Sequence, residues 1–108
     1  SPTLQAPVIT IQSVLGVGDL ETENVRITLT GGKELSLTDW RLEDSDHHIF
    51  VFPAFELFPD GSIQVNSRAG INTATDLYWG LEMAIWESGE TAQLYDETGV
   101  VQATFQVP

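Results

Sequence analysis

Five side chains of types that bind metal ions lie within six consecutive positions, in the segment LEDSDHHIFVF at residues 42–52. These side chains belong to Glu43, Asp44, Asp46, His47 and His48. Calcium takes six to eight oxygen ligands, whereas this segment offers only a few and lacks the spaced acids and glycine of an EF-hand loop. Adjacent histidines on a strand point to opposite faces, so they make a poor chelating pair. We therefore expect no metal site, and Asp44 and Asp46 are only weak candidates for calcium ligands.

The same segment has the composition of a turn between two strands. Aspartate favours turns because its side chain accepts hydrogen bonds from backbone amides two positions further along. Asp44-Ser45-Asp46 lies between a predicted strand that ends at Glu43 and another that begins near His48. The sequence therefore favours a hairpin turn over a metal site.

The sequence contains no motif typical of nucleophilic or acid–base catalysis. The chain has two histidines, both in the predicted turn, and no G-x-S-x-G nucleophile motif. Paired carboxylates such as Glu21 and Glu23 are expected by chance on so acidic a chain, and we expect them on a solvated face. Gly16-Val17-Gly18 is not followed by the further glycine and helix of a phosphate-binding loop. The sequence predicts no enzyme, no catalytic residue and no bound cofactor.

The charge balance excludes one class of partner. Sixteen acidic and four basic residues among 108 give a net charge of −12. Nucleic-acid binding needs a basic surface that displaces counterions, so we predict no nucleic-acid partner. A hydrophobic content of 42% is enough for one folded domain with a continuous core. No apolar run approaches the ~20 residues of a membrane span, so we predict no membrane insertion.

Apolar residues alternate with polar ones along much of the chain, which indicates half-buried β-strands. In NVRITLT, for example, Val25, Ile27 and Leu29 share one face. Turn residues such as Asp and Gly separate the alternating runs. Strands are predicted at residues 8–15, 24–30, 35–42, 49–52, 62–66, 91–96 and 100–107.

Two segments depart from simple alternation. The apolar phase changes between Leu37 and Trp40, which predicts a bulge or corner near Thr38-Asp39 that turns both side chains inward. Residues 74–86 have roughly helical spacing, but Gly80 and three aromatic residues weaken a helix there. We predict an irregular connection with one or two short strands.

Short strands at regular spacing, separated by turns, predict an all-β sandwich. Its core is expected to hold the inward-facing residues of these strands and at least two of the three tryptophans. The predicted core residues are Val25, Ile27, Leu29, Trp40, Leu42, Phe50, Phe52, Val65, Leu77, Trp86 and Leu94.

From Leu20 onward, several short motifs follow one another in a characteristic order. They are Glu23-Asn24-Val25-Arg26-Ile27, LTDWRLED (37–44), FVFP (50–53), LFPDGSIQV (57–65), NTATDLYW (72–79) and IWESGETAQLYDETGVV (85–101). Because these motifs occur in this order, the chain resembles the lamin tail domain family. The resemblance implies an immunoglobulin-like β-sandwich of about seven to nine antiparallel strands at residues 8–108. Residues 1–7 are expected to be a linker stub, because Pro2 and Pro7 flank small and polar residues there. The family's turn before FVFP usually contains a glycine, which Ser45-Asp46-His47 lacks.

The resemblance also implies a function, since lamin tail domains are not catalytic. In prokaryotes such domains resemble accessory modules of secreted or surface proteins, and the acidity of this chain fits that setting. We therefore expect an extracellular or cell-surface interaction module that contacts a protein partner or adjacent domains of the same parent chain. The alternative is a calcium-dependent adhesion or glycan-binding module, with acids at 19–23, 43–46 and 96–97 converging at one end of the sandwich.

Residues 71–86 are the best candidate for an exposed apolar patch. Ile71, Leu77, Tyr78, Trp79 and Met83 are large apolar or aromatic residues within this segment. Side chains of these types are commonly buried. We therefore expect only a minority of the five to form an exposed contact surface.

Overall fold

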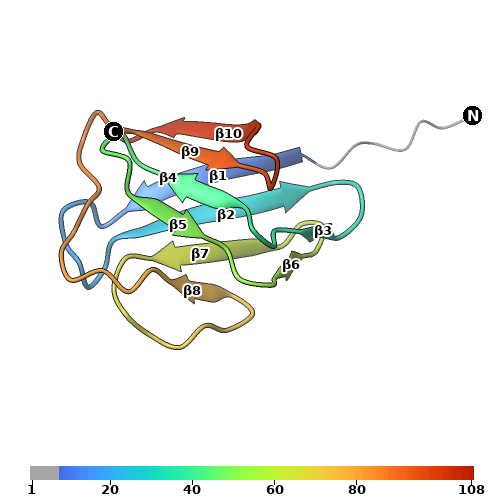
Figure 1. The fold of residues 1–108 in the computed structure, drawn as a ribbon, viewed down its shortest axis with the longest axis horizontal. Helices are drawn as coiled ribbons and strands as arrows, with labels where there is room; N and C mark the ends of the chain where they lie inside the picture. Colours follow the sequence, from blue (N-terminus) through green and yellow to red (C-terminus); the bar gives the residue numbers. More distant parts are fainter. Residues whose placement is uncertain (1–7) are drawn as a thin grey trace, which may run out of the picture.

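The computed structural model describes residues 8–108, which form ten β-strands and no helix (Figure 1). The strands are β1 (Val8–Leu15), β2 (Asn24–Thr30), β3 (Leu35–Ser36), β4 (Arg41–Glu43), β5 (Ile49–Val51), β6 (Glu56–Leu57), β7 (Ser62–Asn66), β8 (Asp76–Tyr78), β9 (Thr91–Tyr95) and β10 (Val101–Gln106). Residues 1–7, the predicted linker stub, lie outside the described residues. Within residues 8–108, no helix is long and apolar enough to cross a membrane.

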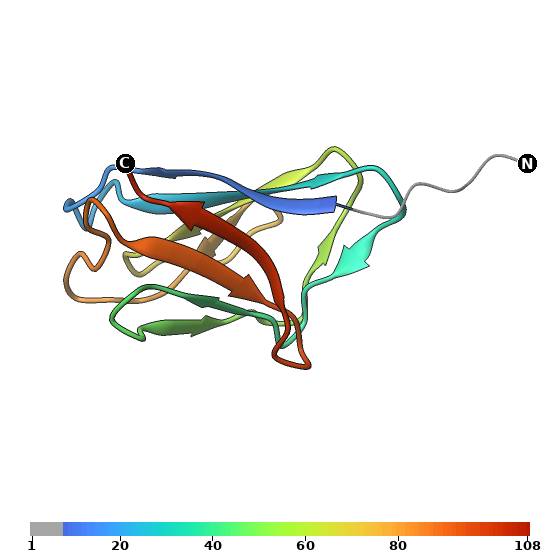
Figure 2. The same ribbon diagram turned by 90° about the horizontal axis from the view of Figure 1, so that it is seen from above.

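Two four-stranded sheets form the layers of a sandwich (Figure 2). Their strand orders are β1-β2-β7-β8 and β10-β9-β4-β5, while β3 pairs with β6 in a two-residue ladder. The predicted all-β, immunoglobulin-like sandwich is confirmed. The strand number exceeds the predicted seven to nine because β3 and β6 have only two residues each, which is too short to show alternation.

One strand pair corrects the expectation of purely antiparallel sheets. β8 runs parallel to β7, with Gln64 opposite Asp76 and Asn66 opposite Tyr78. Residues 67–75 carry the chain back toward the start of β7 instead of reversing it in a hairpin (Figure 1). Both strands therefore run in the same direction, and β8 is the short strand predicted within the irregular connection.

The phase change between Leu37 and Trp40 is a turn that separates β3 from β4. Asp39 has a φ of 65°, and the backbone amide of Trp40 donates to the carbonyl of Leu37 over 3.0 Å. This turn brings Leu37, Trp40 and Leu42 into the core, where at most 4% of each is exposed. The predicted corner is confirmed, and the predicted strand at 35–42 is two strands.

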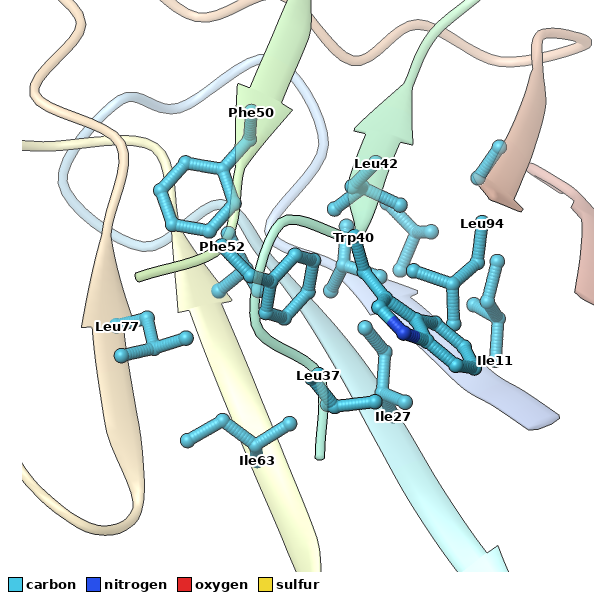
Figure 3. Packing of buried hydrophobic residues seen from close by; sticks show 14 of the residues in the cluster. Ile11, Ile27, Leu37, Trp40, Leu42, Phe50, Phe52, Ile63, Leu77 and Leu94 are labelled. Atoms are coloured by element: carbon cyan, nitrogen blue, oxygen red, sulfur yellow. The ribbon is translucent and has the colours of Figure 1, made fainter. Parts of the chain in front are cut away.

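The core lies between the two sheets, and all eleven residues predicted for it are buried. Figure 3 shows Phe50, Phe52 and Trp40 directed into the space that Leu77 and Ile27 line from the opposite sheet. The rings of Phe50 and Trp79 lie 5.6 Å apart, and Trp79 lies 6.3 Å from Trp86. These aromatic contacts join β5 to the long segment that follows β8.

Glu23 corrects the expectation that the carboxylates near the start of β2 lie on a solvated face. Only 1% of Glu23 is exposed. Its carboxylate accepts hydrogen bonds from the backbone amides of Ile85 and Trp86 at 3.0 and 3.1 Å, and from the hydroxyl of Ser67. A buried carboxylate requires such donors. The side chain therefore ties the start of β2 to the segment that carries Trp86.

Candidate functional site

The predicted hairpin turn between β4 and β5 is present, and the carboxylate of Asp44 is its centre. Only 3% of Asp44 is exposed. Its Oδ1 accepts hydrogen bonds from the backbone amides of Asp46 at 3.1 Å and His48 at 2.7 Å. Its Oδ2 lies 2.8 Å from Nδ1 of His48. One buried side chain therefore organises the backbone of the whole turn.

The same turn brings three potential metal ligands together. Asp44, Asp46 and His48 each place one ligand atom within 4.8 Å of the others. The oxygens of Asp44 already accept the hydrogen bonds that form the turn, so a cation would have to displace at least one donor. Calcium needs several further oxygens in addition. The hydrogen bonding therefore favours the turn over a metal centre.

His47 has a backbone conformation that usually requires glycine. Its φ is 67°, in the left-handed region that side chains with a Cβ rarely adopt. Its Nδ1 lies 2.6 Å from Oε1 of Glu43. This hydrogen bond, with the charge of Glu43, raises the pKa of His47. The turn thus keeps the geometry of a glycine-containing turn although histidine occupies the strained position.

Two hydrogen bonds connect the turn to the start of β9. The backbone amide of Ser45 donates to Oε2 of Glu90 over 3.1 Å, and the amide of Thr91 donates to the hydroxyl of Ser45 over 2.9 Å. Burial raises the pKa of Glu90, and the nearby charge of Asp44 acts in the same direction. Within residues 8–108, Oε1 of Glu90 is buried without a hydrogen-bond partner. The turn is therefore held by tertiary contacts as well as by its own residues.

β5 is an edge strand whose backbone is open on one side. Among the described strands it pairs only with β4. The amide of Phe52 donates to the carbonyl of Trp40 over 2.8 Å, so the backbone N–H of Phe52 points toward β4. Because the backbone groups of successive residues in an antiparallel strand point to alternate sides, those of Phe50 also point toward β4. The N–H and C=O groups of Ile49 and Val51 point to the free side.

The side chains of the same two residues are also exposed, by 45% for Ile49 and 56% for Val51. Strand register places Val51, Arg41, Tyr95 and Val101 in one row across the outer face of this sheet. The guanidinium of Arg41 lies over the ring of Tyr95, 5.5 Å from its centroid. Arginine and tyrosine are enriched in protein interfaces. The β5 edge therefore adjoins a surface of interface-like composition.

The large apolar and aromatic residues of the segment at residues 71–86 differ in their exposure. Ile71 and Met83 are 87% and 70% exposed. Leu77 is buried, and Trp79 is half-buried against the core cluster. Tyr78 is also half-buried, so of the five residues only Ile71 and Met83 are largely exposed and only Leu77 is fully buried.

Ile49 and Val51 are candidate functional residues that the sequence prediction omits. A signal for them is present in IFVF, because alternation places them outward once Phe50 and Phe52 are assigned to the core. Their position at a sheet edge has no local signal. Strand order depends on pairings between segments far apart in the chain.

The chain crosses between the two four-stranded sheets after β2, after β5 and after β8. This two-layer arrangement defines an immunoglobulin-like β domain. The model of the Lamin Tail Domain family matches residues 2–108. The chain therefore belongs to the Lamin Tail Domain family, a non-catalytic domain family, and the resemblance seen in the sequence is confirmed. The match includes most of the segment predicted as a linker stub. A search of curated proteins finds no match.

Proposed function

We propose that this lamin tail domain is a non-enzymatic protein-binding module of a secreted or cell-surface protein. The observation that carries the proposal is the free edge of β5. There, the backbone groups and the side chains of Ile49 and Val51 are open at the same place. Membership of a non-catalytic family and the acidic composition support the class of protein and its location.

Strand addition is the mechanism that this edge suits. An extended segment of a partner would pair its backbone with Ile49 and Val51, and its side chains would contact their exposed apolar surface. Arg41 and Tyr95 on the adjoining face would extend the contact. Two copies of a chain with a net charge of −12 repel each other. The expected occupant is therefore another protein or an adjacent domain.

Substitution of Val51 by proline tests this mechanism with little damage to the fold. Proline lacks the N–H group, and at Val51 that group points away from β4. The matched control is Thr104→Pro on β10, the opposite edge of the same sheet. The backbone amide of Val107 donates to the carbonyl of Glu90 and so points toward β9. Alternation along β10 therefore places the N–H of Thr104 on the side away from β9.

The experiment is affinity enrichment of binding proteins with three immobilised forms of the chain, namely wild type, Val51→Pro and Thr104→Pro. We expect partners that bind wild type and Thr104→Pro and are lost from Val51→Pro. Hydrogen exchange of the complex should then show slower exchange at the amides of Ile49 and Val51. A specific partner that binds Val51→Pro as well as wild type would exclude strand addition at β5.

The alternative of a calcium-dependent adhesion or glycan-binding module has less support. Its central acid, Asp44, is buried and accepts hydrogen bonds from the backbone of its own turn. In the turn after β9, Asp96 accepts hydrogen bonds in the same way from Thr98 and Val100. Both carboxylates therefore have a structural role that explains their presence.

A further inference from the structure

A pocket of about 390 Å³ lies where β1, β3 and the turn after β9 meet. Its apolar lining comes from Ile9, Leu35 and Trp40. Ile9 and Trp40 are buried and Leu35 is half-buried, so these side chains are held in place by the core. Ligand pockets in proteins range from ~300 to 1,000 Å³. This pocket is therefore of a size for one or two amino-acid side chains.

The polar lining of the pocket carries only negative charge. It consists of Asp96 and Glu97 together with the uncharged Ser36 and Gln102. Hydrogen bonds, chiefly from the hydroxyl of Thr98, lower the pKa of Asp96 to about 2, so this carboxylate is ionised at physiological pH. Within residues 8–108, neither Asp96 nor Glu97 forms an ion pair. The pocket thus offers two carboxylates whose charge is not neutralised by a contacting base.

Trp40 is the largest apolar residue that lines this pocket. Its indole Nε1 is buried and donates to no acceptor within residues 8–108. Figure 3 shows the nitrogen-bearing edge of Trp40 on the side of Leu37, which is buried and does not line the pocket. The indole of Trp86, in the core, is unpaired in the same way. The nitrogen of Trp40 is therefore not open to a ligand, and Trp40 contributes apolar surface to the pocket.

We propose that this pocket binds a lysine or arginine side chain of a partner polypeptide. The aliphatic stem would lie against Ile9, Leu35 and Trp40, as the stems of basic side chains commonly do on apolar surfaces. The cationic end would face Asp96 and Glu97. The negative charge of the whole chain attracts a basic segment, and the site is separate from the β5 edge.

An NMR titration of the ¹⁵N-labelled chain tests the proposal. The probes are the blocked tripeptides Gly-Lys-Gly and Gly-Arg-Gly, the same tripeptide with uncharged norleucine in place of lysine, and the free polyamine spermidine. We expect the lysine and arginine peptides to shift the indole signal of Trp40 and the side-chain amide signal of Gln102. The norleucine peptide should leave both signals in place.

Two matched charge variants locate the interaction. Glu97 makes no hydrogen bond in the turn, so Glu97→Gln removes one charge from the pocket without removing a structural contact. The substitution should lower the affinity for the lysine peptide about two- to fivefold, which corresponds to the free energy of an exposed ion pair. Glu82→Gln removes a charge from an exposed position that does not line the pocket and should have no effect.

Three results would overturn the proposal. The first is the absence of any shift at Trp40 and Gln102 with the basic peptides. The second is equal binding of the norleucine peptide, or an equal loss in Glu97→Gln and Glu82→Gln. The third is tighter binding of spermidine than of either basic peptide, which would assign the pocket to a free polyamine.

Discussion

Two hairpin turns in this molecule share one hydrogen-bond pattern but differ in what holds them. In the turn after β4, Asp44 accepts from the amides two and four residues further along. In the turn after β9, Asp96 accepts from the amides of Thr98 and Val100 in the same positions, at 2.9 and 3.0 Å. In both turns the fourth residue has a positive φ, which is 67° at His47 and 89° at Gly99.

The difference between them is the source of the stabilisation. Gly99 adopts its positive φ without strain, and the turn at Asp96 is closed by its own residues. His47 carries a Cβ in the same conformation, so its turn needs support from outside. That support comes from the buried Asp44 and from the two hydrogen bonds between Ser45 and residues 90–91. One turn is local, and the other depends on the tertiary structure.

Substitution of either aspartate by alanine should show the difference between the two turns most clearly. Asp44→Ala removes a buried carboxylate and leaves the backbone amides of Asp46 and His48 without their acceptor, and we expect it to lower the free energy of unfolding by about 2–4 kcal/mol. Asp96→Ala should cost less, because water can replace a carboxylate in an exposed turn. Urea unfolding followed by tryptophan fluorescence measures both. Equal losses in the two variants would show that the tertiary contacts of Asp44 add nothing to its role.

Exchange of the residues at the positive φ should have smaller effects of opposite sign. His47→Gly relieves backbone strain and should raise Tm by roughly 2–5 °C. Gly99→Ala introduces the same strain and should lower Tm by a similar amount. Its new Cβ would lie 3.2 Å from Nη2 of Arg41, a flexible side-chain end that can move. Differential scanning calorimetry of both variants gives the comparison, and a fall in Tm for His47→Gly would contradict it.

The contrast between the turns also explains what the sequence could predict. The alternation of apolar residues predicts most strands, the core residues and the location of both turns, because these depend on neighbouring positions. The burial of Asp44 and the strain at His47 depend on Glu90 and Thr91, which lie more than forty positions away. The burial of Glu23 and the edge position of β5 escape prediction for the same reason. Each depends on contacts between distant segments.

The dependence of stability on pH is the smallest effect that distinguishes the turns, and it has opposite signs. The pKa of His47 is raised above its ordinary value of 6.5 by Glu43, so its contribution is complete below that pH and is lost as the pH rises through the folded-state value. The pKa of Glu90 is also raised, by burial, so its ionisation weakens the folded state as the pH rises above 4.5. Both groups therefore make the turn at Asp44 less stable as the pH rises.

Asp96 acts in the other direction. Its pKa falls from 3.8 to about 2 on folding, so its contribution is complete above pH 3.8 and is lost as the pH falls toward 2. Urea unfolding at a series of pH values should therefore show a decline below pH 4 that Asp96→Asn reduces. It should also show a decline above pH 6.5 that His47→Gln reduces. If Asp96→Asn instead altered the alkaline limb, the two turns would be coupled, and the separation into a local and a tertiary turn would fail.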